Sequence, residues 1–454
     1  MLAGLTQVGR RVQHFRTRAC LTARESVGQV TGLPGRHLDS WLMPPPVCRR
    51  LFAQAAVGAE LSVIEGTLGT PVAGTSGRWC EHPGDLRPIA ETLDLPILAV
   101  VSCRGSDSGS FHLPAIPERA NAVLLDEVDD PALLPRFRRM IHLAAGLPVI
   151  GAIEALPELR AALENQPVGR MLSADMIDDL ARSFLKYADL AALDELAWRR
   201  PFPAPAVRRD LAGRGRRRFR VAYAQDEAFG EYFPDTIESL EALGADLVEF
   251  SPLRDGALPE GVNLVMIGCG MPDHHAEELA SNHSMIAALG EHVCRGRRIY
   301  SEGGGTAYLG RRMIINGRGY RGAGILPFDA VLVDAPPPPT PVIRQLLHDS
   351  WLGPRGTVVR GYRSGRWRLI AGLERFECPA CFGALSAEGD WFFHHHAVGS
   401  LLHLHLGALP EVVAAFAGPH RPSLKRPTAR GLADRDADRN RGFDRDDDRE
   451  PPDS

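Results

Sequence analysis

The sequence predicts an α/β protein with two doubly wound sheets, and three observations support this prediction. Short runs rich in Val, Ile and Leu show little alternation, which is typical of parallel strands covered by helices on both faces. Segments with helical spacing separate these runs. The pattern stops at a Pro- and Arg-rich segment and then begins again. In the first set we expect strands at Leu61–Ile64, Ile97–Val101, Ala122–Leu125 and Pro148–Ile150, and helices at Pro131–Ala145 and Ala174–Leu193.

Length and composition limit the class of protein. A chain of 454 residues is too long for one ordinary core, so we expect two domains. A net charge of −4 favours neither nucleic-acid nor membrane binding, and no apolar run reaches the roughly 18 residues of a membrane helix. The N-terminus lacks the apolar core of a secretory signal, and the eight cysteines are mostly dispersed. These features predict a cytoplasmic protein.

The change in composition places the domain boundaries. We expect a first domain at 1–200, a linker at 201–218, a second domain at 219–420 and a disordered, highly charged tail at 421–454. The Arg214–Arg218 run could hold a phosphate, but a solvated linker is the default reading. In the second domain we expect strands at Arg220–Ala224, Leu247–Phe250 and Leu264–Ile267, and helices at Asp235–Ala242 and Ala276–Arg295. Short strands from Ile325 to Trp367 and a closing segment at Leu401–Ala415 follow.

One stretch of the second domain is typical of a catalytic turn. Arg297–Tyr300 is predicted to be a buried strand, Ser301–Gly305 a tight turn, and Thr306 the start of a helix. In a nucleophile elbow, such a turn exposes one side chain beside converging backbone N–H groups. Acyl transfer needs Ser or Cys at that apex. The apex here is Gly303, which has no side chain.

Several strings resemble a known family, the cobyrinic acid a,c-diamide synthases. Val221–Leu253 resembles the opening of their glutamine amidotransferase domain, Ile267–Leu279 (IGCGMPDHHAEEL) their Gly-rich Pro-Glu-Leu-His segment, and Gly399–Glu411 (GSLLHLHLGALPE) their C-terminal histidine motif. In the first half, Val12–Phe15, His37–Met43 (HLDSWLM) and Val63–Gly69 (VIEGTLG) resemble parts of the ATP-binding, dethiobiotin-synthetase-like domain. The similarity runs in order over roughly residues 1–415.

The resemblance implies a ligase of corrin biosynthesis. A P-loop NTPase-like domain would use ATP and Mg²⁺ to activate carboxylates of the macrocycle. A class I-like amidotransferase domain would hydrolyse glutamine through a Cys–His pair and supply ammonia. The partner would be a corrin or related tetrapyrrole, and a homodimer stays open.

The departures from this family fall on the catalytic parts of the amidotransferase domain. The family's Glu-Cys-Gly-Gly elbow is Glu302–Gly305 here, with glycine at the nucleophile position 303. By resemblance, Gly268, Gly270 and Gly304 are the elbow and oxyanion positions, and His403 is the partner histidine, with His405 two residues on. His403 could equally be an ordinary partly buried histidine. Cys269 could supply a displaced thiol, although a small buried hydrophobe is the simpler reading. We therefore predict that glutaminase activity is lost.

The predicted nucleotide site differs from the family pattern even more than the elbow does. The sequence contains no GxxxxGK(S/T) string, and its opening resembles the helix that follows a P-loop, so we expect the first strand and the loop upstream of Met1. By resemblance, Asp39 would lie near nucleotide and Glu65 near Mg²⁺ or the ring carboxylate, or each could be a solvated loop carboxylate. Asp126 replaces an asparagine of the family and would repel phosphate, and Tyr362–Trp367 lacks the family's histidine.

The sequence does not favour a zinc site. Cys378 and Cys381 could join His394, His395 and His396, but only one CxxC is present and the histidines are adjacent. Asp273–His275 has no metal spacing of its own. Two functions remain: a diamide synthase relative that uses free ammonia, or a non-catalytic homologue that binds a tetrapyrrole or a partner enzyme.

Overall fold

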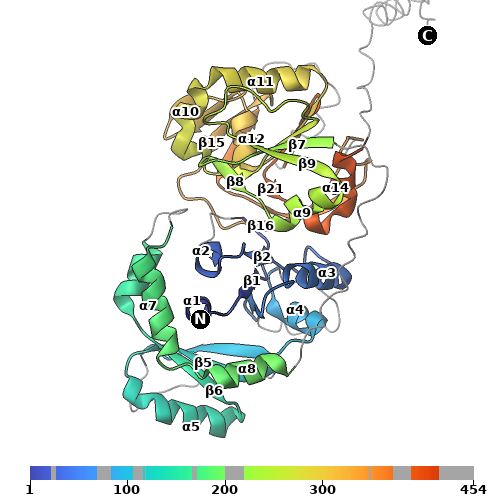
Figure 1. The fold of residues 1–454 in the computed structure, drawn as a ribbon. Helices are drawn as coiled ribbons and strands as arrows, with labels where there is room; N and C mark the ends of the chain where they lie inside the picture. Colours follow the sequence, from blue (N-terminus) through green and yellow to red (C-terminus); the bar gives the residue numbers. More distant parts are fainter. Residues whose placement is uncertain are drawn as a thin grey trace, which may run out of the picture.

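The computed structural model describes residues 1–21, 27–68, 83–105, 116–117, 119–165, 171–199, 219–346, 349–371 and 390–418. The predicted linker, the charged tail and the Cys378–Cys381 pair lie outside these residues. Residues 1–199 are called the first half below, and residues 219–418 the second half. Figure 1 shows the two halves stacked. In this view α3 (Pro45–Ala55) and β2 (Arg36–His37) of the first half face α9 (Pro234–Ala242) and β16 (Thr340–Gln345) of the second.

The first half contains two three-stranded parallel sheets, in the orders β2-β1-β3 and β4-β5-β6. Its strands are β1 Val12–Arg16, β2 Arg36–His37, β3 Leu61–Glu65, β4 Ile97–Ser102, β5 Ala120–Val128 and β6 Val149–Glu154. Its helices are α1 Leu2–Gln7, α2 Val27–Thr31, α3 Pro45–Ala55, α4 Leu86–Leu93, α5 Leu134–Ala145, α6 Pro157–Glu164, α7 Ala174–Leu185 and α8 Leu190–Trp198, with a 3₁₀ turn at Pro131–Leu133.

The sequence predicts one doubly wound sheet without its first strand, and the first half forms two separate three-stranded sheets. Strands β3 and β4 end their two sheets and are not hydrogen-bonded to each other. One hydrophobic cluster nevertheless joins the two sheets, because Val12 and Val63 pack with Leu98 and Leu124. The two sheets therefore share one core although their neighbouring edges are not joined.

The second half is built on a six-stranded sheet in the order β19-β20-β12-β10-β7-β9. Its strands are β7 Phe219–Ala224, β9 Ala245–Phe250, β10 Leu264–Ile267, β12 Arg298–Glu302, β19 Trp391–His394 and β20 Ala397–Ser400. All neighbours are parallel except β19 and β20. Smaller sheets are formed by β8 Phe229–Glu231 with β11 Cys269–Gly270; by β13 Arg312–Ile315, β14 Arg318–Arg321, β15 Phe328–Leu332 and β18 Trp367–Ala371; and by β16 Thr340–Gln345, β17 Val358–Arg363 and β21 Leu402–His403.

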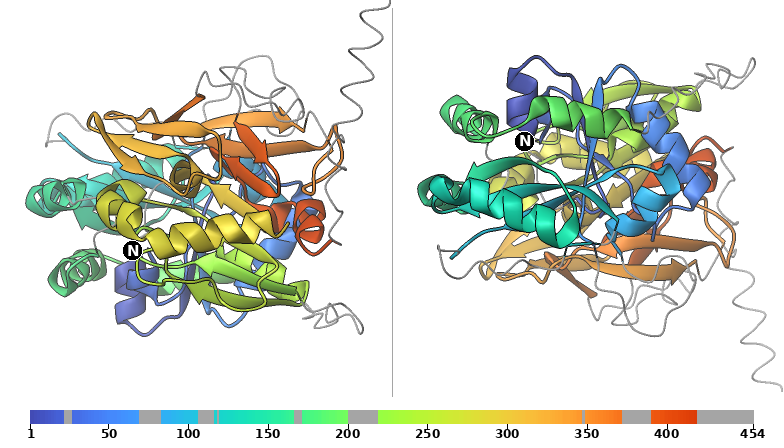
Figure 2. Two further views of the ribbon diagram at one scale, coloured as in Figure 1. Left: turned by 90° about the horizontal axis from the view of Figure 1, so that it is seen from above. Right: turned by 90° about the horizontal axis from the view of Figure 1, so that it is seen from below.

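Helices cover both faces of this six-stranded sheet. The helices are α9 Pro234–Ala242, α10 Ala276–Ser281, α11 His283–Cys294, α12 Gly303–Leu309 and α14 Pro410–Phe416, with 3₁₀ turns at Pro272–His275 and Leu406–Ala408. Alternate residues of β10 face different clusters: Val265 packs with α10, α11 and α12, whereas Met266 packs with α9 and α14. Figure 2, left, shows α11, in yellow, on the outer surface. This half is doubly wound, as predicted.

Two predicted helices are each divided in two. The helix expected at Ala276–Arg295 is interrupted at Asn282, whose side chain accepts from Met285 N at 3.1 Å and so begins α11. The helix expected at Ala174–Leu193 stops after Leu185, and Asp189 starts α8 by accepting from Ala192 N. Both breaks are made by a capping side chain inside an apolar pattern.

No helix in the described part of the chain is long and apolar enough to cross a membrane.

Candidate functional site

The predicted elbow forms, and it is tighter than expected. Strand β12 runs through Glu302 and helix α12 starts at Gly303, so the predicted turn at Ser301–Gly305 contains no separate loop residues. Gly303 has φ +50°, a left-handed conformation that glycine adopts without strain. Gly305 permits close packing, because a Cβ there would lie 2.3 Å from the carbonyl oxygen of Ile267. The strand–turn–helix geometry of an elbow is therefore present.

A side chain at position 303 would project towards a thiol and an imidazole. An ideal Cβ there would lie 3.1 Å from Sγ of Cys269 and 3.3 Å from Nε2 of His403. Cys269 begins β11, and His403 ends β21, so these groups come from separate strands. The structure thus brings together three of the residues singled out in the sequence: Gly303, Cys269 and His403.

His403 is held as a neutral base at this point. It is buried, and burial lowers its pKa to about 4. Its Nδ1 is buried and has no hydrogen-bond partner among the described residues. The imidazole therefore lacks the second hydrogen bond that usually fixes a catalytic histidine.

Cys269 lies between two glycines, Gly268 and Gly270, and its side chain is buried beside the apex. Burial, followed by the charges of Glu302 and Glu231, raises the pKa of its thiol well above the ordinary value. The reactive form of cysteine is the thiolate. The thiol of Cys269 therefore stays protonated, and its side chain fills space beside the apex.

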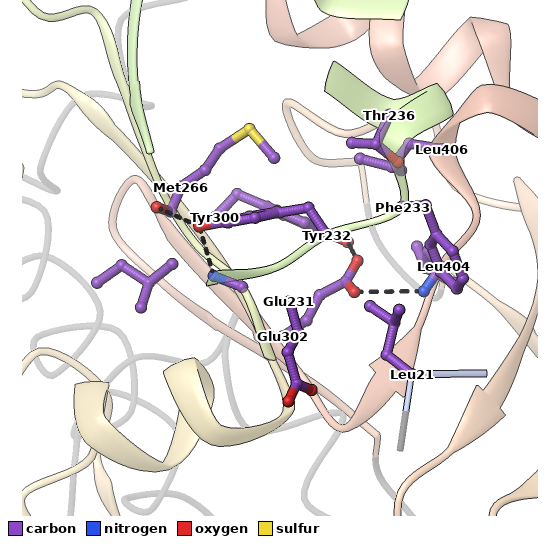
Figure 3. A pocket seen from close by; sticks show the side chains of 12 residues that line it. Leu21, Glu231, Tyr232, Phe233, Thr236, Met266, Tyr300, Glu302, Leu404 and Leu406 are labelled. Atoms are coloured by element: carbon purple, nitrogen blue, oxygen red, sulfur yellow. Dashed lines mark hydrogen bonds between the residues drawn. The ribbon is translucent and has the colours of Figure 1, made fainter. Parts of the chain in front are cut away.

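Glu302, next to the apex, is a buried carboxyl that the sequence-based reasoning did not single out as functional. Burial raises its pKa to about 8, opposed by hydrogen bonds from the Tyr300 hydroxyl and Leu404 N. It lines a cavity of about 10 Å³ together with Tyr232, Thr236 and, from the first half, Leu21 (Figure 3). This volume is close to the minimum that one water molecule needs.

The three predicted oxyanion glycines have different surroundings. The N–H of Gly268 donates to the Tyr232 hydroxyl at 2.9 Å (Figure 3), so this donor is already engaged. Gly270 and Gly304 lie against each other, because a Cβ at 304 would be 2.8 Å from the carbonyl oxygen of Gly270. Their role as oxyanion donors stays a prediction.

Asp39 is not a solvated loop carboxylate. It is fully buried and accepts hydrogen bonds from Ala19 N at 3.1 Å, Trp41 N at 2.9 Å and the hydroxyl of Tyr362 in the second half at 2.5 Å. Burial raises its pKa, opposed by these bonds. Asp39 therefore lies at the contact between the halves. Sequence reasoning missed this role of Tyr362, because it noted only the family histidine that the segment lacks.

Glu65, at the end of β3, is an exposed carboxylate, as in the solvated reading, and it also has partners within the protein. Its Oε2 lies 3.0 Å from Nε2 of the buried His14 and 3.8 Å from Nε of Arg16. Mg²⁺ prefers several oxygen ligands, whereas this carboxylate faces an imidazole and a guanidinium. No group of three or more metal-ligating side chains occurs among the described residues. The residues present do not fit a magnesium site at Glu65.

The remaining candidates have structural partners. Asp126 forms an ion pair with Arg160 at 2.5 Å. Asp273 pairs with Arg366 at 2.6 Å and contacts His274. His394 Nδ1 lies 2.8 Å from the carbonyl oxygen of Ile325. The two cysteines of the zinc hypothesis lie outside the described residues.

Comparisons with known proteins give consistent matches. Residues 220–406 match the family described as the CobB/CobQ-like glutamine amidotransferase domain. Similar curated proteins are named cobyrinate a,c-diamide synthase. The one from Salmonella typhimurium is 31% identical over 297 residues, covering 62% of this chain and 62% of that protein. The one from Magnetococcus marinus is 30% identical over 317 residues, covering 66% and 67%. The one from Syntrophotalea carbinolica is 27% identical over 454 residues, covering 92% and 93%.

Proposed function

The chain belongs to the cobyrinate a,c-diamide synthase family, and from this premise we propose that it amidates corrin side-chain carboxylates with free ammonia instead of glutamine. The observation that supports the change of nitrogen source is the elbow at Gly303. Its shape is retained, but the apex carries no nucleophile, and the nearest thiol, Cys269, is buried and protonated. Hydrolysis of glutamine through a thioester needs an accessible thiolate at this point.

The test of glutaminase loss is glutamate release by the full chain. We expect no release above a no-enzyme blank. A matched control is the double variant Gly303→Cys with Cys269→Ala, which moves the thiol to the apex beside His403 without crowding it. Release by the double variant would show that the assay detects a working site on this scaffold. Release by the unaltered chain, abolished by Cys269→Ala, would refute the proposed loss.

The family reaction also needs ATP and Mg²⁺, and the described residues do not supply their usual ligands. We include as part of the proposal that the first half is an incomplete P-loop NTPase-like domain. The support is the pair of neighbouring sheet ends, β3 and β4, which share a core but are not hydrogen-bonded. In a parallel sheet, one further strand between them would join the two sheets.

A second function is favoured by Asp39 and Glu65. Both carboxylates are engaged by protein groups, as a chain without phosphoryl-transfer chemistry would permit. The alternative is a non-catalytic protein that binds a tetrapyrrole or a partner enzyme. Incubation of the full chain with cobyrinic acid, ATP, Mg²⁺ and ammonium chloride, followed by mass spectrometry, separates the two. An amide product supports the ligase, whereas a change in corrin absorbance without product supports the binding protein.

A further inference from the structure

Strand β17 is one of the elements of the second half that contact the first half; another is α9, where Asp235 pairs with Arg36 of β2. The hydroxyl of Tyr362 donates to Asp39, and two residues earlier Arg360 donates to the carbonyl oxygen of Trp41 at 2.8 Å. The guanidinium of Arg360 also lies 5.9 Å from the centre of the Trp41 ring. Two side chains of β17, two residues apart, therefore bind the same short segment, residues 39–41.

The carboxylate that receives Tyr362 is rigidly held. Asp39 is fully buried, and backbone N–H groups of Ala19 and Trp41 fix its two oxygens. Tyr362 is also fully buried, and its ring lies 5.6 Å from the Trp41 ring. Loss of the Tyr362 hydroxyl would leave a desolvated acceptor oxygen on Asp39.

The same strand holds the elbow histidine. Strand β21 is only two residues long, and it pairs antiparallel with β17 so that Tyr362 lies opposite His403. The imidazole of His403 has no hydrogen bond at Nδ1 among the described residues to orient it. The position of its Nε2, 3.3 Å from where a Cβ at 303 would lie, is therefore set by the backbone of β21. That backbone is paired with β17, and the next residue, Leu404, donates its N–H to Glu302.

We propose that Asp39 and Tyr362 form a positioning pair, through which the first half fixes His403 at the elbow of the second half. Asp39 anchors the Tyr362 hydroxyl, β17 is held on residues 39–41, and the short pairing with β21 then keeps the imidazole turned into the protein. In this proposal Asp39, the carboxylate that the family resemblance places near nucleotide, also organises the amidotransferase-like site.

The test measures how fast diethyl pyrocarbonate acylates His403 in the full chain at neutral pH, mapped by mass spectrometry. Neutral imidazoles react when solvent reaches them. In Tyr362→Phe, which removes only the hydroxyl, we expect the rate at His403 to rise about tenfold or more through local opening of β21. His292, buried in the second half away from β21, should stay as slow as in the parent.

Tyr223→Phe is the matched control, because it removes a tyrosine–carboxylate hydrogen bond to Glu249 at 2.7 Å in the same half. The proposal is overturned if His403 reacts no faster in Tyr362→Phe than in the parent. It is also overturned if His292 accelerates equally or if Tyr223→Phe has the same effect, since either result shows general loosening. If Tyr362→Phe does not fold, Asp39→Asn, which keeps one acceptor oxygen, gives the same comparison.

Discussion

Positions 303 and 269 share one small volume, and only position 269 carries a side chain. The sulfur of Cys269 lies where a side chain at 303 would project, and His403 borders the same space. A single substitution at 303 would therefore place two thiols side by side and would not simply restore a nucleophile.

We expect Gly303→Cys to form a disulfide with Cys269 under oxidising conditions. A Cβ at 303 would lie 3.8 Å from Cβ of Cys269, and the Cβ atoms of a disulfide are typically about 3.8 Å apart. The positive φ adds backbone strain of roughly 1–2 kcal/mol, so the reduced variant should be less stable than the parent. Thiol counting and peptide mapping without reductant measure the bond. If the thiols at positions 269 and 303 both stay free after oxidation, the apex geometry differs from the one described above.

The stability of the protein should fall as Glu302 is forced to ionise. This carboxyl has a pKa of about 8 when folded and an ordinary value of 4.5. Between these pH values the folded state keeps a proton that the unfolded state has released, so the free energy of unfolding decreases as pH rises. Glu302→Gln cannot ionise.

The measurement is denaturant unfolding of Glu302→Gln and the parent at several pH values. The stability of the variant relative to the parent should increase from about pH 5 to about pH 8. Glu260→Gln, at an exposed position, is the control and should show no such trend. A difference independent of pH would mean that Glu302 is ionised in the folded state.

Among the elements, the break between α10 and α11 shows what a capping residue does in this fold. Asn282 accepts from Met285 N, and its Nδ2 donates to the carbonyl oxygens of Pro252 and Asp255 at 2.9 Å. One side chain therefore starts α11 and fastens it to the loop after β9.

We expect Asn282→Ala to lower the free energy of unfolding by about 1–2 kcal/mol, because it removes an N-cap and two loop contacts. Urea unfolding monitored by circular dichroism measures the change. Asn165→Ala removes one exposed hydrogen bond to Ala161 and should cost less than about 0.5 kcal/mol. Equal effects in the two variants would contradict the assigned role.

The elements that the sequence predicted best are those buried on both faces. Leu264–Ile267 has the predicted bounds, because four consecutive buried apolar residues have no amphipathic alternative. Helix ends were less predictable, since apolar spacing continues across Asn282 and only the capping contact shows the break. The glycine run predicts a turn, whereas Gly304 and Gly305 are helical, and the backbone after β10 lies too close to them for a larger side chain.

The candidate site was predictable where it depends on local pattern and not where it depends on docking. Gly303 and His403 follow from the turn and from family resemblance. The contact between Asp39 and Tyr362 joins residues 323 positions apart in the chain, and the local sequence around either residue does not predict the other as its partner.

For the whole molecule, β4 is an end strand in the described part of the first half and exposes apolar surface. Val100 on the end strand β4 is 62% exposed. Apolar edge strands promote pairing between molecules, and a lysine at such an edge opposes it. We expect Val100→Lys to reduce concentration-dependent self-association without lowering the melting temperature.

Sedimentation velocity over a range of concentrations measures this association. Leu143→Lys is the matched control, because Leu143 is 74% exposed on α5 and not on a strand edge. Reduction by both variants would point to a general charge effect. Reduction by neither would show that the β4 edge takes no part in self-association.

The backbone contact at Gly305 has a wider consequence. A carbonyl oxygen 2.3 Å from where a methyl group would stand excludes larger residues there, whether or not any amide is ever cleaved. Steric demand alone can preserve this bend after its reaction has been lost. A search that identifies hydrolases by the glycines of this turn would therefore also find inactive proteins. The residue at the apex of the turn distinguishes active from inactive proteins.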